Sequence, residues 1–292
     1  MGEASPDGRW GESPASVIAQ LEKVELASLG SPFDLEGVTD LLPPGSARSA
    51  LDTAMHDLAA RCLGVSLTNM LGLGGRALPQ TSVTVPIADI ETMVTRTKHL
   101  SDHPILKVKV GFEGDVEAIG AMREVYDGEI RVDANEGWSE AEAIERLEHL
   151  APFRIQLCEQ PIRAGDHESL HRVTEASSIP IYADEDVGTA RDVAALVGAV
   201  DGVNLKLRKA GGIREAIRAV SVAKANEMGT MLGWDLESGV AAAAGAAIAP
   251  LFDHIDLDGP LLLAEDPYPF VRYERGTLEV VPRPGLGGAT ER

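Results

Sequence analysis

Short runs rich in β-branched residues recur along most of the chain and alternate with amphipathic stretches. Eight such runs lie near residues 81, 105, 129, 154, 179, 201, 229 and 253, about one every 25 residues. The segments between them carry apolar residues at helical spacing, so the pattern predicts βα units and a parallel sheet. Because the step is even and nothing signals that the chain doubles back, we expect a closed (β/α) barrel rather than an open doubly wound sheet.

The segments on either side of the predicted barrel follow other patterns. Residues 47–71 carry apolar positions at helical spacing, and a glycine-rich stretch at 71–79 then breaks this pattern. The first 46 residues contain one weak helical segment at 13–26, and the tail after the eighth run predicts two short strands or a meander. We therefore divide the chain into a mostly helical segment 1–78, a barrel 79–264 and a C-terminal segment 265–292.

Composition and charge exclude several classes of protein. The 292 residues are 44% hydrophobic and 25% charged, which is enough apolar material for a sizeable core. The formal charge of −20 repels phosphate backbones and anionic membranes, so we expect neither a nucleic-acid-binding nor a membrane protein. The two cysteines have no disulfide or zinc-site spacing, and the first residues do not resemble a secretory signal. A cytoplasmic protein is the expectation.

Two lysines in the second predicted strand point to the barrel interior. Lys107 and Lys109 alternate with aliphatic residues at 106, 108 and 110, so the period of two places both lysines on one face. We expect the aliphatic side chains to face the surrounding helices and the two ammonium groups to lie inside the barrel. Burying two like charges is costly unless anions compensate them.

Acidic residues at the ends of the next three predicted strands supply such anions. Asp133, Glu159 and Asp184 are each about one βα step apart, so their carboxylates should converge at the C-terminal ends of the strands, where barrel active sites lie. Three oxygen ligands without Cys or His suit a hard cation, Mg²⁺ rather than Zn²⁺. Lys206 follows one step later, four strands on from Lys109, which is the opposite wall of an eight-stranded barrel.

This set of side chains suits the deprotonation of a carbon next to a carboxylate. A divalent metal and an ammonium group stabilise the developing enediolate charge, and an amine base removes the proton. Two lysines on opposite walls allow one to remove the proton and the other to return it on the far side, which inverts the carbon. A lone Lys-x-Lys is usually a solvated edge, and a carboxylate after a strand is often a helix N-cap. Five such residues at matched barrel heights favour a single site.

The ordered motifs resemble those of the enolase superfamily, and within it the muconate-lactonizing-enzyme-like subgroup. The matching segments are KVKVG (107–111), VDANEGW (132–138), CEQPI (158–162), YADED (182–186) and NLKLRKAGGI (204–213). The resemblance runs from about residue 47 to the end. It implies that Asp133, Glu159 and Asp184 bind Mg²⁺. It also implies that Lys109 and Lys206 are the acid/base lysines and that Lys107 steadies the substrate carboxylate. Asn135 and Glu185 would support the metal ligands, although either could be an ordinary cap.

The eighth predicted strand narrows the resemblance to the dipeptide epimerases of this subgroup. Asp256 and Asp258 lie on one face of HIDLDG, and paired carboxylates near the mouth favour a cation. In the dipeptide epimerases such an Asp-x-Asp holds the α-amino group of the dipeptide; the alternative is a polar loop with two solvated acids. Glu237 and Ser238 match the Glu-Ser of the family and are predicted near the substrate. Asp235 either tunes specificity or is merely exposed.

The resemblance also implies a fold with a capping domain. We expect a TIM-like (β/α)7β barrel with a partial α+β cap, built from the N-terminal region and the C-terminal tail. Relatives begin with a strand-rich capping segment, and Met1 stands where that segment would end. The expectation is therefore that the N-terminal part of the cap is lacking. The chain is then truncated, or its start was misassigned, or it works with an open site.

These features predict a Mg²⁺-dependent epimerase that inverts the α-carbon of a dipeptide residue by two-lysine 1,1-proton transfer through an enediolate. L-Ala-D/L-Glu is one candidate substrate, and a homo-oligomer is expected from the family. An alternative is an o-succinylbenzoate synthase or muconate cycloisomerase type of enzyme, whose substrates lack an ammonium group for the Asp-x-Asp. A second is a catalytically impaired, truncated homologue. A Schiff-base aldolase barrel needs only one lysine and leaves the three carboxylates unexplained.

Overall fold

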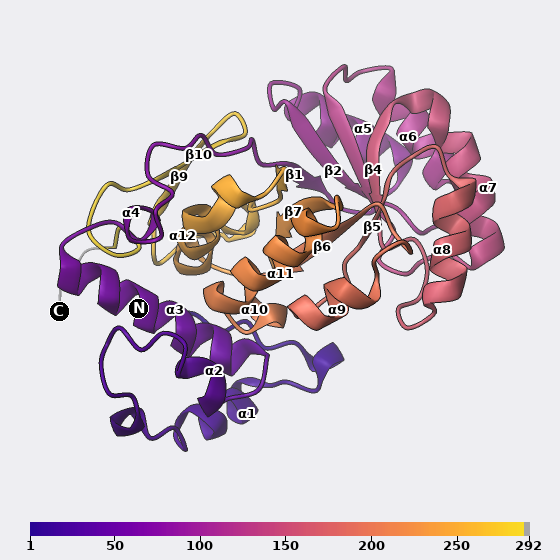
Figure 1. Cartoon of the computed structure of the whole chain (residues 1–292). Coiled ribbons are helices and arrows are strands. Elements are labelled where there is room, and N and C mark those ends of the chain that lie inside the picture. The colour runs from indigo at the N-terminus through magenta and orange to yellow at the C-terminus, as the bar shows by residue number, and fades with distance from the viewer. Residues whose placement is uncertain (289–292) are drawn as a thin grey trace.

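Eight parallel strands in chain order form the largest element of the protein, seen here in a computed structural model that describes residues 1–288 (Figure 1). The strands are β1 Val83–Val85, β2 Ile105–Lys109, β3 Glu129–Asp133, β4 Ile155–Glu159, β5 Ile181–Ala183, β6 Gly202–Lys206, β7 Gly229–Gly233 and β8 His254–Ile255. A parallel bridge between Thr81 and Ile255 joins the segment before β1 to β8. It brings the two edges of the sheet together, so the predicted barrel is confirmed.

Helices follow the first seven strands and cover the outside of the sheet, which completes the (β/α)7β pattern (Figure 1). They are α5 Ile90–His99, α6 Asp115–Arg123, α7 Glu140–Leu150, α8 His167–Ala176, α9 Ala190–Ala195, α10 Leu207–Ala210 with α11 Ile213–Ala225, and α12 Gly239–Ile248. The main core lies between helices and strands, and outward-facing Leu106 and Val108 of β2 are fully buried in it. None of the helices of residues 1–288 combines the length and the apolar character that crossing a bilayer requires.

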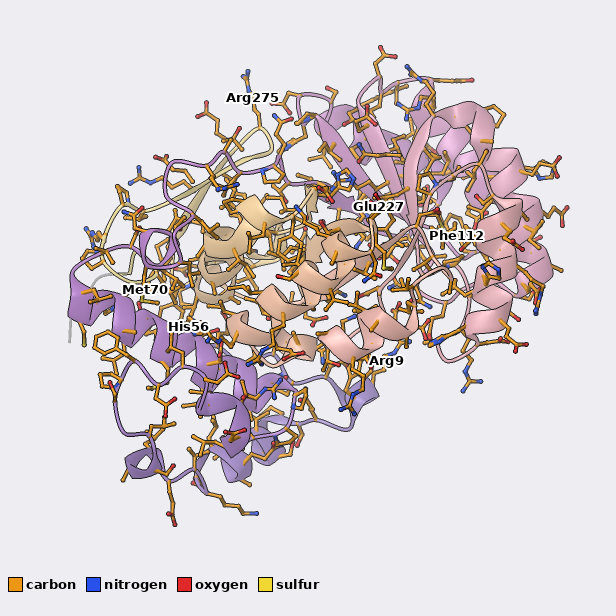
Figure 2. All side chains as sticks on the ribbon, in the orientation of Figure 1. Arg9, His56, Met70, Phe112, Glu227 and Arg275 are labelled. Carbon is orange, nitrogen blue, oxygen red and sulfur yellow. The ribbon has the colours of Figure 1, made fainter. Side chains whose placement is uncertain are left out.

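The N-terminal helices and the C-terminal hairpin pack against one side of the barrel. They are α1 Pro14–Leu21, α2 Val38–Leu41, α3 Ser46–Leu63 and α4 Leu67–Met70, with β9 Val271–Glu274 and β10 Thr277–Val280. His56 on α3 and Met70 at the end of α4 are marked in Figure 2. The helical pattern predicted at 47–71 forms two helices rather than one, because Gly64 takes a left-handed conformation (φ 70°) and ends α3. Glycine adopts this conformation without the strain that a side chain would add.

Helix α3 fixes the turn between α10 and α11, directly after the strand that carries Lys206. Arg48 donates hydrogen bonds to the carbonyl oxygens of Ala210 and Gly211, while Asp52 Oδ2 accepts one from the N–H of Ile213 at 2.6 Å. A Cβ on Gly211 would lie 2.4 Å from the Arg48 side chain, and one on the next glycine would lie 2.4 Å from Asp52. The Gly-Gly of NLKLRKAGGI therefore allows the cap helix to approach the backbone here.

The interior below the strand ends contains a buried arginine and a histidine. Arg131 of β3 is 1% exposed, and it donates to Gln156 Oε1 at 2.7 Å and to the Ile255 carbonyl at 2.9 Å. Its Nη2 lies 3.2 Å from His254 Nδ1. Burial and, secondarily, the positive charge of Arg131 lower the pKa of His254 to about 4. His254 is therefore neutral in the folded protein at neutral pH.

Lowering the pH should destabilise the protein through His254. Its folded pKa of about 4 lies below the ordinary value of 6.5, so between these values the unfolded chain binds more protons than the folded one. The contribution of His254 is thus complete above pH 6.5 and is lost as the pH falls toward 4. The free energy of unfolding in urea should be measured at pH 7 and at pH 5, which lies about one and a half units below the ordinary histidine pKa. Its loss between the two pH values should be smaller for His254→Gln than for the parent. His149→Gln, an exposed change, should keep the parental loss. Equal losses in all three proteins would contradict the low pKa of His254.

Candidate active site

A cavity of about 290 Å³ opens at the C-terminal ends of the barrel strands. Side chains that end or follow β2, β5 and β6 line its floor, among them Lys109, Asp184 and Lys206. The 3-10 turn Gly8–Trp10 of the N-terminal segment contributes Arg9 and Trp10 to its rim. The cavity therefore combines the barrel mouth with the N-terminal region.

Lys107 and Lys109 of β2 both point into the barrel, as the period of two predicts. Lys107 is buried, and its Nζ lies 3.0 Å from Asp133 Oδ2, 2.8 Å from Glu159 Oε2 and 2.9 Å from Asp256 Oδ2. Lys109 Nζ lies one level higher and donates to Asp133 Oδ2 and to Asn135 Oδ1, each at 2.7 Å. The strand register explains these contacts, because Lys109 is aligned with Asp133 and Asp133 with Glu159.

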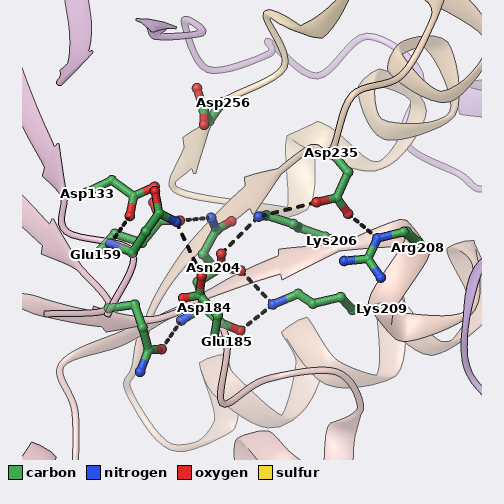
Figure 3. A network of polar contacts seen from close by, with 12 residues as sticks. Asp133, Glu159, Asp184, Glu185, Asn204, Lys206, Arg208, Lys209, Asp235 and Asp256 are labelled. Carbon is green, nitrogen blue, oxygen red and sulfur yellow. Dashed lines mark hydrogen bonds and ion pairs between the residues drawn. The ribbon is translucent and has the colours of Figure 1, made fainter. Parts of the chain in front are cut away.

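Lys206 ends β6, which is five strands along the sheet from β1 and four from β2. Its ammonium group lies close to two carboxylates, those of Asp184 and Asp235 (Figure 3). Its Nζ donates to Asp184 Oδ2 at 2.9 Å and lies 3.7 Å from Asp235 Oδ1. Lys209 of α10 binds the other oxygen of the same carboxylate, Asp184 Oδ1, at 2.5 Å. Asp235 also accepts from Arg208, so it lies between a β6 lysine and an α10 arginine (Figure 3).

Burial and mutual repulsion shape the charges of this cluster. Burial would lower the pKa of Lys107, but the adjacent carboxylates of Asp133 and Asp256 outweigh it and raise that pKa well above its usual value. Lys206 behaves in the same way, since burial is outweighed by Asp184, and its pKa is raised. Burial, reinforced by Asp133, raises the pKa of Glu159 to about 8. The raised pKa of Glu159 indicates that the neighbouring lysines supply less positive charge than its buried carboxylate needs to stay ionised.

The three predicted metal ligands lie among lysine side chains. Within residues 1–288 no three His, Cys, Asp or Glu side chains are grouped as metal ligands. The carboxylates of Asp133, Glu159 and Asp184 instead contact lysine ammonium groups. Their chemistry still fits a hard cation, because all three are buried oxygen donors from consecutive strands, and Glu159 Oε2 accepts no hydrogen bond of good geometry although Lys107 Nζ lies nearby. Asn204 Nδ2 donates to the other oxygen, Glu159 Oε1, at 2.8 Å.

The two aspartates of the Asp-x-Asp pair after β8 lie in different surroundings, Asp256 at the cavity and Asp258 in the core. Asp256 lines the cavity, where it accepts from Ser82 Oγ at 2.7 Å as well as from Lys107. Asp258 is fully buried and accepts from the N–H of Thr84 at 2.7 Å and from Trp234 Nε1 at 2.6 Å. Burial and the charge of Asp256 raise the pKa of Asp258 to about 7. Of the two, the structure places only Asp256 on the cavity wall.

Glu237 and Ser238 lie outside the cavity lining. The N–H and the hydroxyl of Ser238 each donate to the carboxylate of Glu3 at 2.7 Å, and Ala241 N–H also donates to it at 3.0 Å. Glu3 thereby caps α12, where a carboxylate is favoured by the free N–H groups and the helix dipole. Burial, with Asp235 nearby, raises the pKa of Glu237 to about 8.

Several residues at the site were not singled out from the sequence. Asn204 precedes Lys206 by two positions in β6, so its inward direction follows from strand periodicity and could have been predicted. Lys209 and Arg208 lie on the short helix after that strand, where periodicity no longer applies. Arg9 reaches the site only through contacts with Glu136 and Glu185, far away in the sequence.

Comparisons with known proteins agree with this geometry. The family model described as enolase C-terminal domain-like matches residues 87–291. An L-Ala-D/L-Glu epimerase of Bacteroides thetaiotaomicron is 36% identical, over 98% of this chain and 76% of the relative. A hydrophobic dipeptide epimerase of Roseobacter litoralis is 38% identical, over 98% of this chain and 87% of the relative. The solved structure of the dipeptide epimerase of Enterococcus faecalis V583 complexed with Mg and the dipeptide L-Leu-L-Tyr superposes with a TM-score of 0.93, at 30% identity, over 99% of this chain and 87% of that one. On these grounds the chain belongs to the enolase superfamily and, within it, to the dipeptide epimerases.

Proposed function

We propose that this protein is a Mg²⁺-dependent dipeptide epimerase that inverts the α-carbon of the C-terminal residue. The observation that carries the proposal is the placement of Lys109 and Lys206 on opposite walls of one cavity. Each ammonium group contacts a carboxylate of the predicted metal set, Asp133 for the first and Asp184 for the second. A cytoplasmic location belongs to the same proposal, since Cys62 and Cys158 are both free thiols.

The side chains have distinct roles in this proposal. A dipeptide placed between the two lysines presents one face of its α-carbon to each amine, so one removes the proton and the other returns a proton to the opposite face. Lys107, held among three carboxylates, supplies positive charge for the substrate carboxylate. Asp256, which lines the same cavity, supplies negative charge for the free amino group of the dipeptide.

Asp133, Glu159 and Asp184 would hold the magnesium ion. When bound, a divalent ion supplies positive charge that stabilises the enediolate as it forms. The lysines then transfer the proton and add positive charge that helps to neutralise the buried carboxylates. The closed barrel and the N-terminal turn limit the access of water to the reacting carbon.

Proton exchange in D₂O tests the proposed activity directly. Incubation of the protein with L-Ala-L-Xaa dipeptides and Mg²⁺ should bring deuterium into the α-position of the second residue, together with formation of the other epimer. NMR follows both events in one sample. The panel should include acidic, apolar and basic second residues. A complete lack of exchange across this panel would contradict the proposed function.

Magnesium should stabilise the folded protein through the same carboxylates. At a concentration of about 100 Kd a ligand of the folded state adds about 2.7 kcal/mol, which at ~2–4 °C per kcal/mol gives a rise in Tm of about 5–10 °C. Scanning fluorimetry with Mg²⁺, and again after EDTA, measures the shift. Glu159→Gln should lose most of it, whereas Glu175→Gln, an exposed change on α8, should keep it. A parental shift in Glu159→Gln would remove Glu159 from the metal set.

A further inference from the structure

Large apolar side chains gather at the rim of the cavity. Trp10, Leu236 and Leu262 are 43%, 67% and 50% exposed, and all three line the cavity. They come from three separate segments, which are the N-terminal turn, the loop after β7 and the segment after β8. A single exposed apolar side chain needs no explanation. Three of them lining one polar cavity give its mouth an apolar surface, the apolar seat formed by Trp10, Leu236 and Leu262.

The charged groups at the same rim do not favour an additional anion. Arg9, on the side of the N-terminal segment that faces the barrel (Figure 2), pairs with Glu136 and Glu185. Arg208 pairs with Asp235 and with Glu12. Both guanidinium groups are thus already matched by two carboxylates each.

The carboxylate of Asp7 adds further negative charge at the rim. It also lines the cavity, and among residues 1–288 it takes part in no ion pair. The one hydrogen bond that its side chain accepts there comes from the backbone N–H of Arg9, at 2.8 Å. An acidic substrate side chain would therefore meet more carboxylates than free cations at this end of the cavity.

The apolar seat adjoins the wall that carries Lys206. The Arg208 guanidinium lies 5.6 Å from the centre of the Trp10 ring, and Leu236 directly follows Asp235, which contacts Lys206. In the proposed reaction the α-carbon lies between Lys109 and Lys206. Its carboxylate is directed to Lys107 and its amide nitrogen leads to the residue whose amino group Asp256 holds, so the remaining substituent, the side chain, is directed to the mouth.

We infer that the residue epimerised by this protein carries an apolar side chain, which rests on Trp10, Leu236 and Leu262. The inference rests on the proposed function and specifies its substrate class. It departs from the expectation of an L-Ala-D/L-Glu substrate, because the glutamate carboxylate would have to compete with the existing partners of Arg9 and Arg208. Burying an apolar side chain on the seat would release its water at no such cost.

A substrate series tests the inference. The kcat/KM for L-Ala-L-Leu and L-Ala-L-Phe, measured by α-deuterium exchange with the intact chain, should exceed that for L-Ala-L-Glu and L-Ala-L-Lys by about tenfold or more. Equal or better turnover of the glutamyl or lysyl dipeptide would overturn the inference and leave the epimerase proposal intact. Absence of exchange with every dipeptide would instead defeat the epimerase proposal, and the substrate class with it.

A matched pair of leucine variants connects the preference to the rim. Leu261 and Leu262 are adjacent and similarly exposed, at 44% and 50%, but only Leu262 lines the cavity. Leu262→Ala should raise KM for L-Ala-L-Leu and lower kcat/KM by about tenfold relative to L-Ala-L-Glu, while Leu261→Ala stays within about twofold of the parent. Leu236→Arg should shift the preference toward L-Ala-L-Glu. The same selectivity in Leu262→Ala as in Leu261→Ala, with no shift in Leu236→Arg, would show that the seat does not bind the substrate side chain.

Discussion

Replacing Lys206 by alanine is expected to abolish epimerisation, with a loss on the order of 10³-fold in kcat. The amine is the only one that the sheet presents from β6 toward the cavity, and it is held by Asp184 at 2.9 Å. Removing it leaves the reacting carbon with a base on one face only. Proton exchange should therefore persist for one of the two diastereomers, the one whose α-hydrogen faces Lys109, and should disappear for the other.

The fold should survive this change, since Lys209 still pairs with Asp184 at 2.5 Å. Circular dichroism and the unfolding midpoint verify that point. Lys206→Arg keeps the positive charge but supplies a group that does not deprotonate, so it should be as inactive as the alanine variant. Lys224→Ala, an exposed change on α11, should retain the parental rate. Two-sided exchange at a normal rate in Lys206→Ala would end the two-lysine mechanism.

The barrel and the floor of the site could be predicted from the sequence because both depend on short, regular periods. Two-residue alternation placed Lys107 and Lys109 inside, and the even βα step placed Asp133, Glu159 and Asp184 at the ends of consecutive strands. In a barrel the strand register carries this order into space, as the alignment of Lys109, Asp133 and Glu159 demonstrates.

The rest of the site depends on contacts that no local period encodes. Asp258 lies on the same predicted face as Asp256, but the chain after β8 leaves the strand conformation and buries Asp258 against Trp234. Ser238 turns to Glu3, a contact between residues 235 positions apart. The end of α3 at Gly64 escaped prediction for a related reason, since the apolar pattern continues across it while the backbone conformation changes. Regular elements are thus predictable, and the loops that complete the site depend on tertiary packing.

Replacing Arg131 by alanine should destabilise the protein by about 3–5 kcal/mol, the range found when a buried polar network loses its central member. The side chain crosses the barrel interior from β3 and contacts Gln156 of β4 and the β8 residues His254 and Ile255. Alanine would leave a cavity and deprive the Ile255 carbonyl of its side-chain donor. It would also remove a positive charge that lies close to Asp256 and Glu159. Urea unfolding, with an unchanged m value, measures the effect.

Two further variants separate the causes of that loss. Arg131→Met keeps most of the volume, so the difference between the methionine and alanine variants reports the cavity, and the loss that remains in methionine reports the charge and the hydrogen bonds. Arg154→Ala is the surface control, because Arg154 is 65% exposed and lies 3.7 Å from Asp127. It should cost less than about 1 kcal/mol. If Arg131→Ala were no more destabilising than Arg154→Ala, the buried contacts of Arg131 with Gln156, His254 and Ile255 would not contribute the stability predicted for them.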